Sequence, residues 1–164
     1  MIRLAQPTDA QRIAEIYNYY ITDTVITFEE ETIDAAEILV RMNKVATLGY
    51  PWIVFETEGV VVGYAYATTW RTRAAYRFTV ESAVYVCHQN HGSGVGTQLY
   101  EFLIDTLKAQ GIHSVIGGIA LPNDKSIRLH ERLGFEKVGE NKEVGKKFER
   151  WIDVGWWQLM LGAK

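Results

Sequence analysis

Residues 77–109 read RFTVESAVYVCHQNHGSGVGTQLYEFLIDTLKA and contain three patterns in direct succession. Residues 77–87 are rich in β-branched and aromatic side chains, which is typical of a buried strand. Residues 88–96 hold three glycines, and in residues 97–108 a leucine recurs at every fourth position, which is the spacing of one helix face. The segment therefore predicts a strand, a glycine loop and a helix that follow one another without a break.

The glycine loop, His91-Gly-Ser-Gly-Val-Gly96, has the features of a phosphate site. Its missing side chains let a ligand approach the main-chain N–H groups at the start of the following helix, where the helix dipole also favours an anion. Glu81 lies on the preceding strand, so a carboxylate and an anion site would share one edge of the sheet. This combination predicts chemistry on a cofactor that carries phosphate.

Two common classes of glycine loop do not fit this sequence. A P-loop requires Gly-Lys-Ser/Thr, which does not follow the glycines here. A Rossmann site requires an acid at the end of the next strand, where this chain has Ile119-Ala-Leu-Pro122. Dinucleotide binding is therefore disfavoured.

Two motifs of the chain resemble those of the GNAT acetyltransferase superfamily. The glycine loop is similar to the Arg/Gln-x-x-Gly-x-Gly/Ala motif that binds the pyrophosphate of acetyl-CoA, with His91 at its first position. Residues 121–135 are similar to the Asn-x-x-Ser helix of that superfamily, which ends in Leu-Gly-Phe. Further segments resemble the phosphinothricin and methionine sulfoximine N-acetyltransferase-like branch, and these are Tyr76–Glu81, Val84–Val86, Leu129–His130 and Val144–Asp153.

This resemblance implies both a fold and a reaction. The implied fold is a single mixed α/β GNAT domain over residues 1–164, with a twisted mixed sheet of about six to seven strands flanked by about four helices. The implied reaction is the direct transfer, within a ternary complex, of an acetyl group from acetyl-CoA to the α-amino group of a small amino acid or analogue. The resembling branch commonly forms homodimers, so we expect a homodimer here.

The resemblance also implies roles for individual residues. Glu81 would be the general base that generates a neutral amine, whereas the residue pattern alone also allows it to pair with Arg77 or a main-chain N–H group. His130 would either protonate the leaving thiolate or have a structural role. The implied acetyl-CoA contacts are Val84, Tyr85, Val86, His91, Gly92, Ser93, Gly94, Val95, Gly96, Asn123 and Ser126. The implied neighbours of the acceptor are Phe28, Trp70, Arg71, Arg73, Tyr76 and Lys147.

Composition limits the classes of function. The chain has 164 residues, of which 48% are hydrophobic and 23% charged, as is typical of a globular domain. Its apolar runs are shorter than the ~20 residues of a membrane helix, and its net charge of −3 disfavours nucleic acid as a partner. The N-terminal residues lack a signal-peptide pattern, so we expect a cytoplasmic protein.

The single cysteine and a histidine pair receive structural interpretations. Cys87 has apolar neighbours and fits a reducing compartment, which favours a buried structural thiol over a nucleophile. His88 and His91 lie in a loop without a nearby cysteine or third ligand, so we expect no metal site.

The remaining strands and the last helix follow from periodicity and turn residues. Further strands are expected at residues 2–5, 51–56, 60–67, 113–120, 135–143 and 151–161. The strand, helix and strand around the glycine loop should form a parallel crossover, and the last two strands an antiparallel pair. A short helix should begin at Asn123 or Asp124, and Trp156 and Trp157 should pack against the sheet.

Two helices are expected before the glycine loop. The first follows a capping box formed by Thr8 and Gln11. The second begins near Thr32, after a solvated acidic segment at residues 29–31. The apolar residues that should face inward on this second helix are Ile33, Ala36 and Val40.

Two alternative functions remain open at this point. A regulatory module that binds acyl-CoA without catalysis would need the glycine loop and Asn123 but not Glu81. A protein N-terminal acetyltransferase would need an open groove rather than a pocket closed by Phe28 and Trp70.

Overall fold

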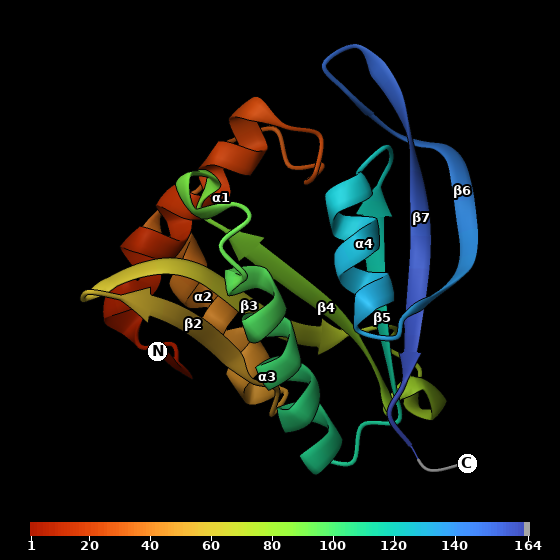
Figure 1. Cartoon of the computed structure of the whole chain (residues 1–164), viewed down its shortest axis with the longest axis horizontal. Coiled ribbons are helices and arrows are strands. Elements are labelled where there is room, and N and C mark those ends of the chain that lie inside the picture. Colours follow the sequence, from red (N-terminus) through yellow and green to blue (C-terminus); the bar gives the residue numbers. More distant parts are fainter. Residues whose placement is uncertain (163–164) are drawn as a thin grey trace.

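The computed structural model describes residues 1–162, which form seven strands and four α-helices (Figure 1). The strands are β1 (Ile2–Leu4), β2 (Trp52–Thr57), β3 (Val60–Thr69), β4 (Thr79–Val86), β5 (Ser114–Ala120), β6 (Glu136–Lys147) and β7 (Arg150–Met160). The α-helices are α1 (Ala10–Asp23), α2 (Ala35–Thr47), α3 (Val95–Ala109) and α4 (Asp124–Arg132). Short 3-10 turns occur at Pro7–Asp9, Ala74–Tyr76 and His88–Asn90.

All seven strands belong to one mixed sheet with the order β1-β2-β3-β4-β5-β7-β6. The β4–β5 pair is parallel and the other neighbouring pairs are antiparallel. Helix α3 connects the two parallel strands, as the sequence predicted, and the antiparallel pairing of β6 with β7 is also confirmed. The predicted mixed α/β fold is therefore confirmed.

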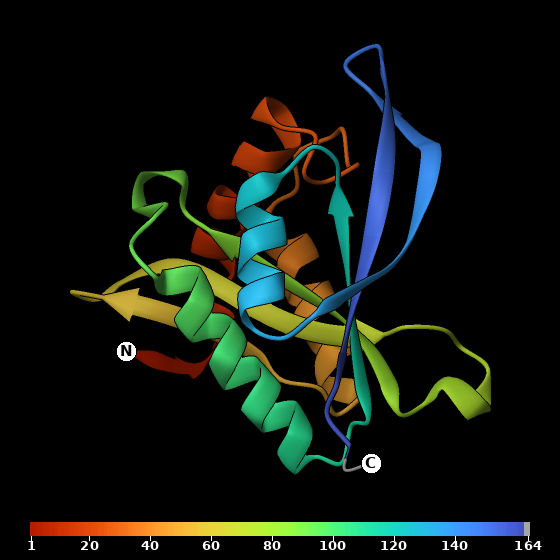
Figure 2. The same cartoon turned by 45° about the vertical axis from the view of Figure 1, so that its right-hand side comes forward.

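Helices cover both faces of the sheet (Figures 1 and 2), and a hydrophobic core lies on each face. Helices α1 and α2 enclose one core, in which Ile13, Ile21 and Ile38 are almost fully buried. Helix α3 contributes to the other core, in which Leu103 and its neighbouring leucines on the helix have no exposed surface. The predicted leucine face of α3 is confirmed, and so is the burial of Cys87, which is 6% exposed.

The start of α1 differs from the prediction. Thr8 and Gln11 do not form the expected capping box; instead the Gln6 N–H donates to the Asp9 carboxylate at 2.7 Å. The Arg3 guanidinium on β1 also binds Asp9, with Nη1 at 2.8 Å from Oδ2. The ion pair to β1 therefore fixes the carboxylate that orders this turn, a contact that local sequence spacing does not reveal.

Of the three residues predicted to face inward on the second helix, only Ile33 packs against the core, and it lies just before the helix. The helix begins at Ala35 rather than near Thr32, because the Asp34 side chain accepts a hydrogen bond from the Glu37 N–H at 2.9 Å. Ile38 and Val45 face the core and are buried, while Val40 is 62% exposed. Ala36 is exposed as well.

The β4–β5 ladder is short compared with the two strands. Their pairing runs from Thr79 and Ser114 to Glu81 and Ile116, although β4 continues to Val86 and β5 to Ala120. Beyond Glu81 the strands separate, β4 staying with β3 and β5 with β7 (Figure 1). The gap between them is therefore bordered by main-chain groups outside the β4–β5 ladder. Among residues 1–162, no helix is long and apolar enough to cross a membrane.

Candidate active site

Two adjoining cavities lie where β4 and β5 separate. The first, of about 470 Å³, is bounded by the end of β4, the glycine loop and α4, and we call it the loop cavity. The second, of about 530 Å³, is bounded by β3, β4, β5, α4 and the β6–β7 hairpin, and we call it the inner cavity. The residues that line both are Ile26, Val84, Tyr85, Ser126 and Leu129. Ligands bound in the two cavities would therefore meet at β4 and α4.

The loop cavity contains the predicted phosphate site. Gly92 and Gly94 have φ values of 79° and 82°, a left-handed conformation that glycine adopts without strain. Gly94 is also the N-cap of α3, and no side chain of the described residues caps this helix. The nearest atom to a Cβ added at Gly94 would be Gln98 Nε2, at 3.8 Å. The first N–H groups of α3 are therefore accessible to an anion.

His91 supports this loop through Tyr20 on α1. The Tyr20 hydroxyl donates to the Val86 carbonyl and lies 2.9 Å from His91 Nε2, so the ring nitrogen donates to the tyrosine oxygen. Partial burial lowers the pKa of His91, which favours the uncharged imidazole. We infer that His91 positions the loop rather than supplying a positive charge.

The other predicted cofactor contacts line the loop cavity, with Ser93 as the exception. The Ser93 hydroxyl donates to the Asn90 carbonyl at 2.5 Å and stabilises the loop. Asn123 lines the cavity and caps α4, because its Oδ1 accepts a hydrogen bond from the Ser126 N–H at 3.2 Å. Of the two caps that the sequence allowed, Asn123 is the one observed.

One wall of the loop cavity is positively charged. Lys125, Arg128 and Arg132 on α4 line it, although the chain as a whole has a net charge of −3. The sequence interpretation missed this wall. The signal was present in the spacing of three, then four, residues, which places the cations on one face of a helix. Cations here would complement phosphate groups bound at the glycine loop.

Glu81 is the only acidic residue among those that line the inner cavity. It is half-buried, and burial raises the pKa of its carboxyl group. Arg77, the alternative partner considered for it, points elsewhere: its guanidinium lies 4.4 Å from the centre of the Phe78 ring and donates to the Ala74 carbonyl. The geometry therefore leaves Glu81 facing the cavity as a potential base.

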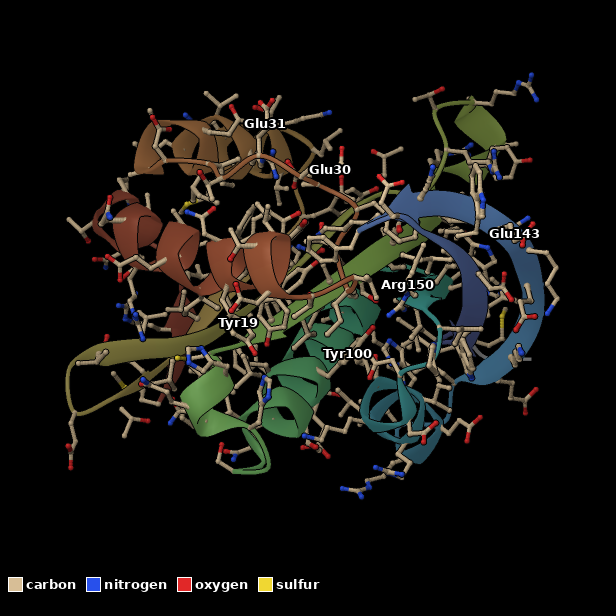
Figure 3. All side chains as sticks on the ribbon, turned by 90° about the horizontal axis from the view of Figure 1, so that it is seen from above. Tyr19, Glu30, Glu31, Tyr100, Glu143 and Arg150 are labelled. Carbon is tan, nitrogen blue, oxygen red and sulfur yellow. The ribbon has the colours of Figure 1, made fainter. Side chains whose placement is uncertain are left out.

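His130 also lines the inner cavity, where it is only 6% exposed. Its Nε2 lies 2.9 Å from the hydroxyl of Tyr100, a residue of α3 that sequence reasoning did not assign to the site (Figure 3). Burial lowers the pKa of His130, so the uncharged ring is favoured. The inner cavity thus holds a base candidate from β4 and an uncharged histidine from α4.

The predicted acceptor neighbours have different positions. Phe28 lines the inner cavity. Trp70 lies outside it and contacts Trp156 edge-on, with ring centres 5.3 Å apart. The remaining loop residues, Arg71, Arg73 and Tyr76, are exposed and lie outside the inner cavity of this chain. Trp157 packs in the core as predicted, whereas Trp156 is a wall of the inner cavity.

Lys147 lies behind the cavity wall rather than on it. It is 2% exposed, and its Nζ donates to the carbonyls of Thr27 at 2.8 Å and Tyr20 at 3.4 Å. Burial lowers the pKa of this amine. Since Thr27 belongs to the segment that carries Ile26 and Phe28 into the cavity, Lys147 holds that segment against β6.

The same segment, residues 24–29, is held from two other sides. The Tyr17 hydroxyl on α1 lies 2.7 Å from the Thr27 hydroxyl. Glu29 forms two hydrogen bonds with the guanidinium of Arg41 on α2, at 2.6 and 2.8 Å. The acidic segment was expected to be solvated, which is correct for Glu30 and Glu31 (Figure 3) but wrong for the half-buried Glu29.

Metal ligands do not gather in the described part of the chain. Among residues 1–162, no group of three or more His, Cys, Asp or Glu side chains is arranged to hold a metal ion. The two loop histidines have other partners, since His88 stacks on Tyr19 at 4.2 Å and His91 contacts Tyr20.

The chain is similar to known proteins in both sequence and structure. A family model described as an acetyltransferase (GNAT) domain matches residues 2–156. The phosphinothricin N-acetyltransferase of Streptomyces viridochromogenes is 43% identical over 96% of this chain and 85% of its own length. The L-methionine sulfoximine/L-methionine sulfone acetyltransferase of Salmonella typhimurium is 40% identical over 98% of this chain and 94% of its own. The solved structure of yncA from Salmonella typhimurium with its cofactor acetyl-CoA has a TM-score of 0.97 and 39% identity, covering 100% of this chain and 95% of that one.

We predict that Gly94→Val severely weakens the binding of CoA, whereas His91→Ala weakens it only modestly. A valine would be strained at a positive φ, and its side chain would occupy the space above the helix start. An uncharged His91 acts only by supporting the loop, so its removal leaves the N–H groups in place. Titration calorimetry with CoA checks both variants, and a large loss for His91→Ala with none for Gly94→Val would contradict the prediction.

Proposed function

Because the chain belongs to the GNAT acetyltransferase family, we propose that it acetylates the α-amino group of a small amino acid or analogue of the phosphinothricin or methionine sulfoximine type. The acetyl donor is acetyl-CoA. The acceptor class is proposed from the relatives, two of which are named for these substrates. The observation that carries the proposal is a half-buried carboxylate, Glu81, in a cavity that adjoins the glycine-loop cavity.

The loop cavity suits the donor in both shape and charge. The open start of α3 offers N–H groups to a pyrophosphate, and the cationic face of α4 offers Lys125, Arg128 and Arg132 to further phosphate oxygens. When bound there, acetyl-CoA supplies the thioester as an activated acyl group. The separated edge of β4 beyond Glu81 supplies main-chain N–H groups that can polarise the thioester carbonyl.

Glu81 would remove a proton from the acceptor ammonium, directly or through one water molecule. Its raised pKa makes the carboxylate a better match for an amine near neutral pH than an ordinary glutamate. The amine nitrogen then bonds to the thioester carbon, and the carbon–sulfur bond breaks to release a thiolate. Direct transfer is favoured because Cys87, the only thiol, is buried and lines neither cavity.

The inner cavity favours a small acceptor over a protein N-terminus. Phe28 packs against Gly145 on β6, where an added Cβ would overlap its ring, and Trp156 forms another wall. These contacts bring the segment of residues 24–29 against the β6–β7 hairpin on one side of the cavity. A peptide chain would need a groove that continues past this contact.

A panel assay tests the proposed function. Thiol release from acetyl-CoA would be followed against amino acids, methionine sulfoximine, phosphinothricin, polyamines and short peptides. Turnover with the amino acid analogues is expected. Turnover with peptides alone would favour a protein N-terminal acetyltransferase, and binding of acetyl-CoA without turnover of any amine would favour a regulatory module.

We predict that Glu81→Gln lowers kcat by roughly 10²- to 10⁴-fold at neutral pH, the usual contribution of a general base. Because its pKa is raised, the wild-type carboxylate becomes protonated and inactive as the pH falls through that value. The loss caused by Glu81→Gln should shrink at high pH, where the acceptor amine is already neutral. The pH dependence of kcat for the wild type and Glu81→Gln checks this prediction. A loss of kcat that does not change with pH would indicate a purely structural role for Glu81.

We predict that Gly145→Ala raises the acceptor KM several-fold, about 1 kcal/mol or more of lost binding, and leaves the KM for acetyl-CoA unchanged. The added methyl group would displace Phe28 from the inner cavity. Gly139→Ala is the matched control, because it lies on the same strand and its added Cβ would meet no described atom within 4 Å. Equal acceptor KM values for the two variants would show that Phe28 does not shape the acceptor site.

The proposal includes a single domain over residues 1–164, a cytoplasmic location and a homodimer. Support for the dimer comes from apolar side chains on β6 and β7 that are about half exposed or more: Val138, Val144, Trp151 and Met160. We predict a dimer in sedimentation velocity at micromolar concentrations, and Trp151→Glu should weaken it because a charge would be buried in the interface. A wild-type monomer under these conditions would rule out the dimer.

A further inference from the structure

Three side chains from different elements form a continuous chain of hydrogen bonds beside the inner cavity. The Ser82 hydroxyl on β4 lies 2.5 Å from the Tyr100 hydroxyl on α3, which lies 2.9 Å from His130 Nε2 on α4. The other ring nitrogen, His130 Nδ1, lies 2.7 Å from the Ser126 carbonyl. All three side chains line the inner cavity, and each is at most 9% exposed.

The partners of His130 determine which nitrogen carries its proton. A carbonyl oxygen can only accept, so Nδ1 must be the protonated nitrogen that donates to Ser126. The ring is uncharged, because burial between the rings of Tyr100 and Phe135 disfavours the imidazolium. Nε2 therefore presents a lone pair and accepts the hydrogen of the Tyr100 hydroxyl. Tyr100 in turn accepts the hydrogen of Ser82.

The surroundings fix this arrangement tightly. A Cβ added at Gly117 on β5 would lie 2.7 Å from His130 Nε2 and 3.4 Å from the Tyr100 hydroxyl, so only glycine leaves room for the contact. The direction of donation runs from Ser82 through Tyr100 to His130 and ends at the Ser126 carbonyl. An uncharged His130 in this state has no proton on Nε2 to give to a thiolate, but it can receive one.

We propose that Ser82, Tyr100 and His130 form a proton relay that accepts a proton from the attacking nitrogen and stores it on His130 during turnover. The proposal rests on the proposed function and adds to it a second proton acceptor besides Glu81. An ammonium that becomes an amide nitrogen loses two protons, and a single carboxylate accepts only one of them. The relay gives the second proton a defined place inside the cavity.

The number of protons is conserved both when the relay takes up a proton and when it returns one. Ser82 Oγ accepts a proton from the nitrogen while passing its own to Tyr100, and Tyr100 passes its own to His130 Nε2. His130 becomes an imidazolium whose Nδ1–H still donates to the Ser126 carbonyl, which lessens the cost of the buried charge. After the carbon–sulfur bond has broken, the same transfers in reverse return the proton to the thiolate sulfur, and His130 is neutral again. The proton taken by Glu81 passes to solvent.

The relay is tested first in the resting protein. Nitrogen NMR of ¹⁵N-histidine-labelled protein at neutral pH should show His130 with Nδ1 protonated and Nε2 unprotonated, and Tyr100→Phe should shift the Nε2 resonance as it loses its donor. This measurement needs no turnover. A protonated Nε2 in the resting wild-type protein would overturn the proposal.

The second test is kinetic and uses Ser82→Ala and Tyr100→Phe. Each should lower kcat at least about tenfold and leave the KM for acetyl-CoA within about twofold. Tyr64→Phe is the control, since it removes a buried tyrosine hydroxyl that lines neither cavity, and its kcat should match the wild type. If Tyr100→Phe does not fold, Ser82→Ala decides the question alone, because it removes one hydroxyl and keeps the contact between Tyr100 and His130.

The two levels of the proposal fail in different ways. If the wild-type protein acetylates no amine, both the proposed function and the relay are wrong. If the wild-type protein acetylates an amino acid analogue and Ser82→Ala has an unchanged kcat, the relay is wrong but the proposed acetyltransferase function is supported.

Discussion

The early end of the β4–β5 ladder is the constraint on which the site depends. Parallel strands that separate after Glu81 and Ile116 leave a gap in the middle of the sheet, with both edges still held by their outer neighbours β3 and β7. Consecutive side chains of β4 point to opposite faces of the sheet, and the gap lets both Glu81 and Ser82 reach the inner cavity. Glu81 lines this cavity without a hydrogen-bond partner among the described residues, while Ser82 also contacts Tyr100 of α3. A fully paired sheet would separate these two groups by a continuous layer of backbone.

Burial shifts the pKa values of the carboxyl group and the imidazole in the inner cavity in opposite directions. It raises the pKa of Glu81 and lowers that of His130, because in both cases it disfavours the charged form. The raised pKa makes Glu81 a stronger base, and the lowered pKa favours the uncharged form of His130. The loop cavity, in contrast, has a positive potential, because the cations of α4 and the positive end of the α3 dipole surround it. The two cavities therefore differ in charge, one lined by cations and the other by a single carboxylate.

Local sequence patterns were sufficient for the elements that build the loop cavity. The leucine repeat of α3, its glycine N-terminus and the Asn123 cap of α4 each depend on residues within a few positions, and the structure contains all three. Contacts between distant segments were not predictable in this way. Arg3 orders Asp9, and Tyr100 joins β4 to α4; neither role can be seen from its neighbours in the sequence. The inward face of α2 was wrong because Ala36 with Val40 and Ile38 with Val45 both have helical spacing, and contacts with distant segments bury the second pair.

Contacts between distant segments also determine the shape of the inner cavity. Phe28 lies in the inner cavity on the segment of residues 24–29. Hydrogen bonds connect this segment to three elements: to α1 through Tyr17, to α2 through Arg41 and to β6 through Lys147. The buried Lys147 amine is satisfied by main-chain carbonyls, and these offset part of its desolvation cost. Tyr17 and Arg41 therefore stabilise the position of this segment although neither of them lines the inner cavity. The shape of the inner cavity therefore depends in part on residues outside it, whereas the glycine side of the loop cavity is formed by the backbone of a single loop.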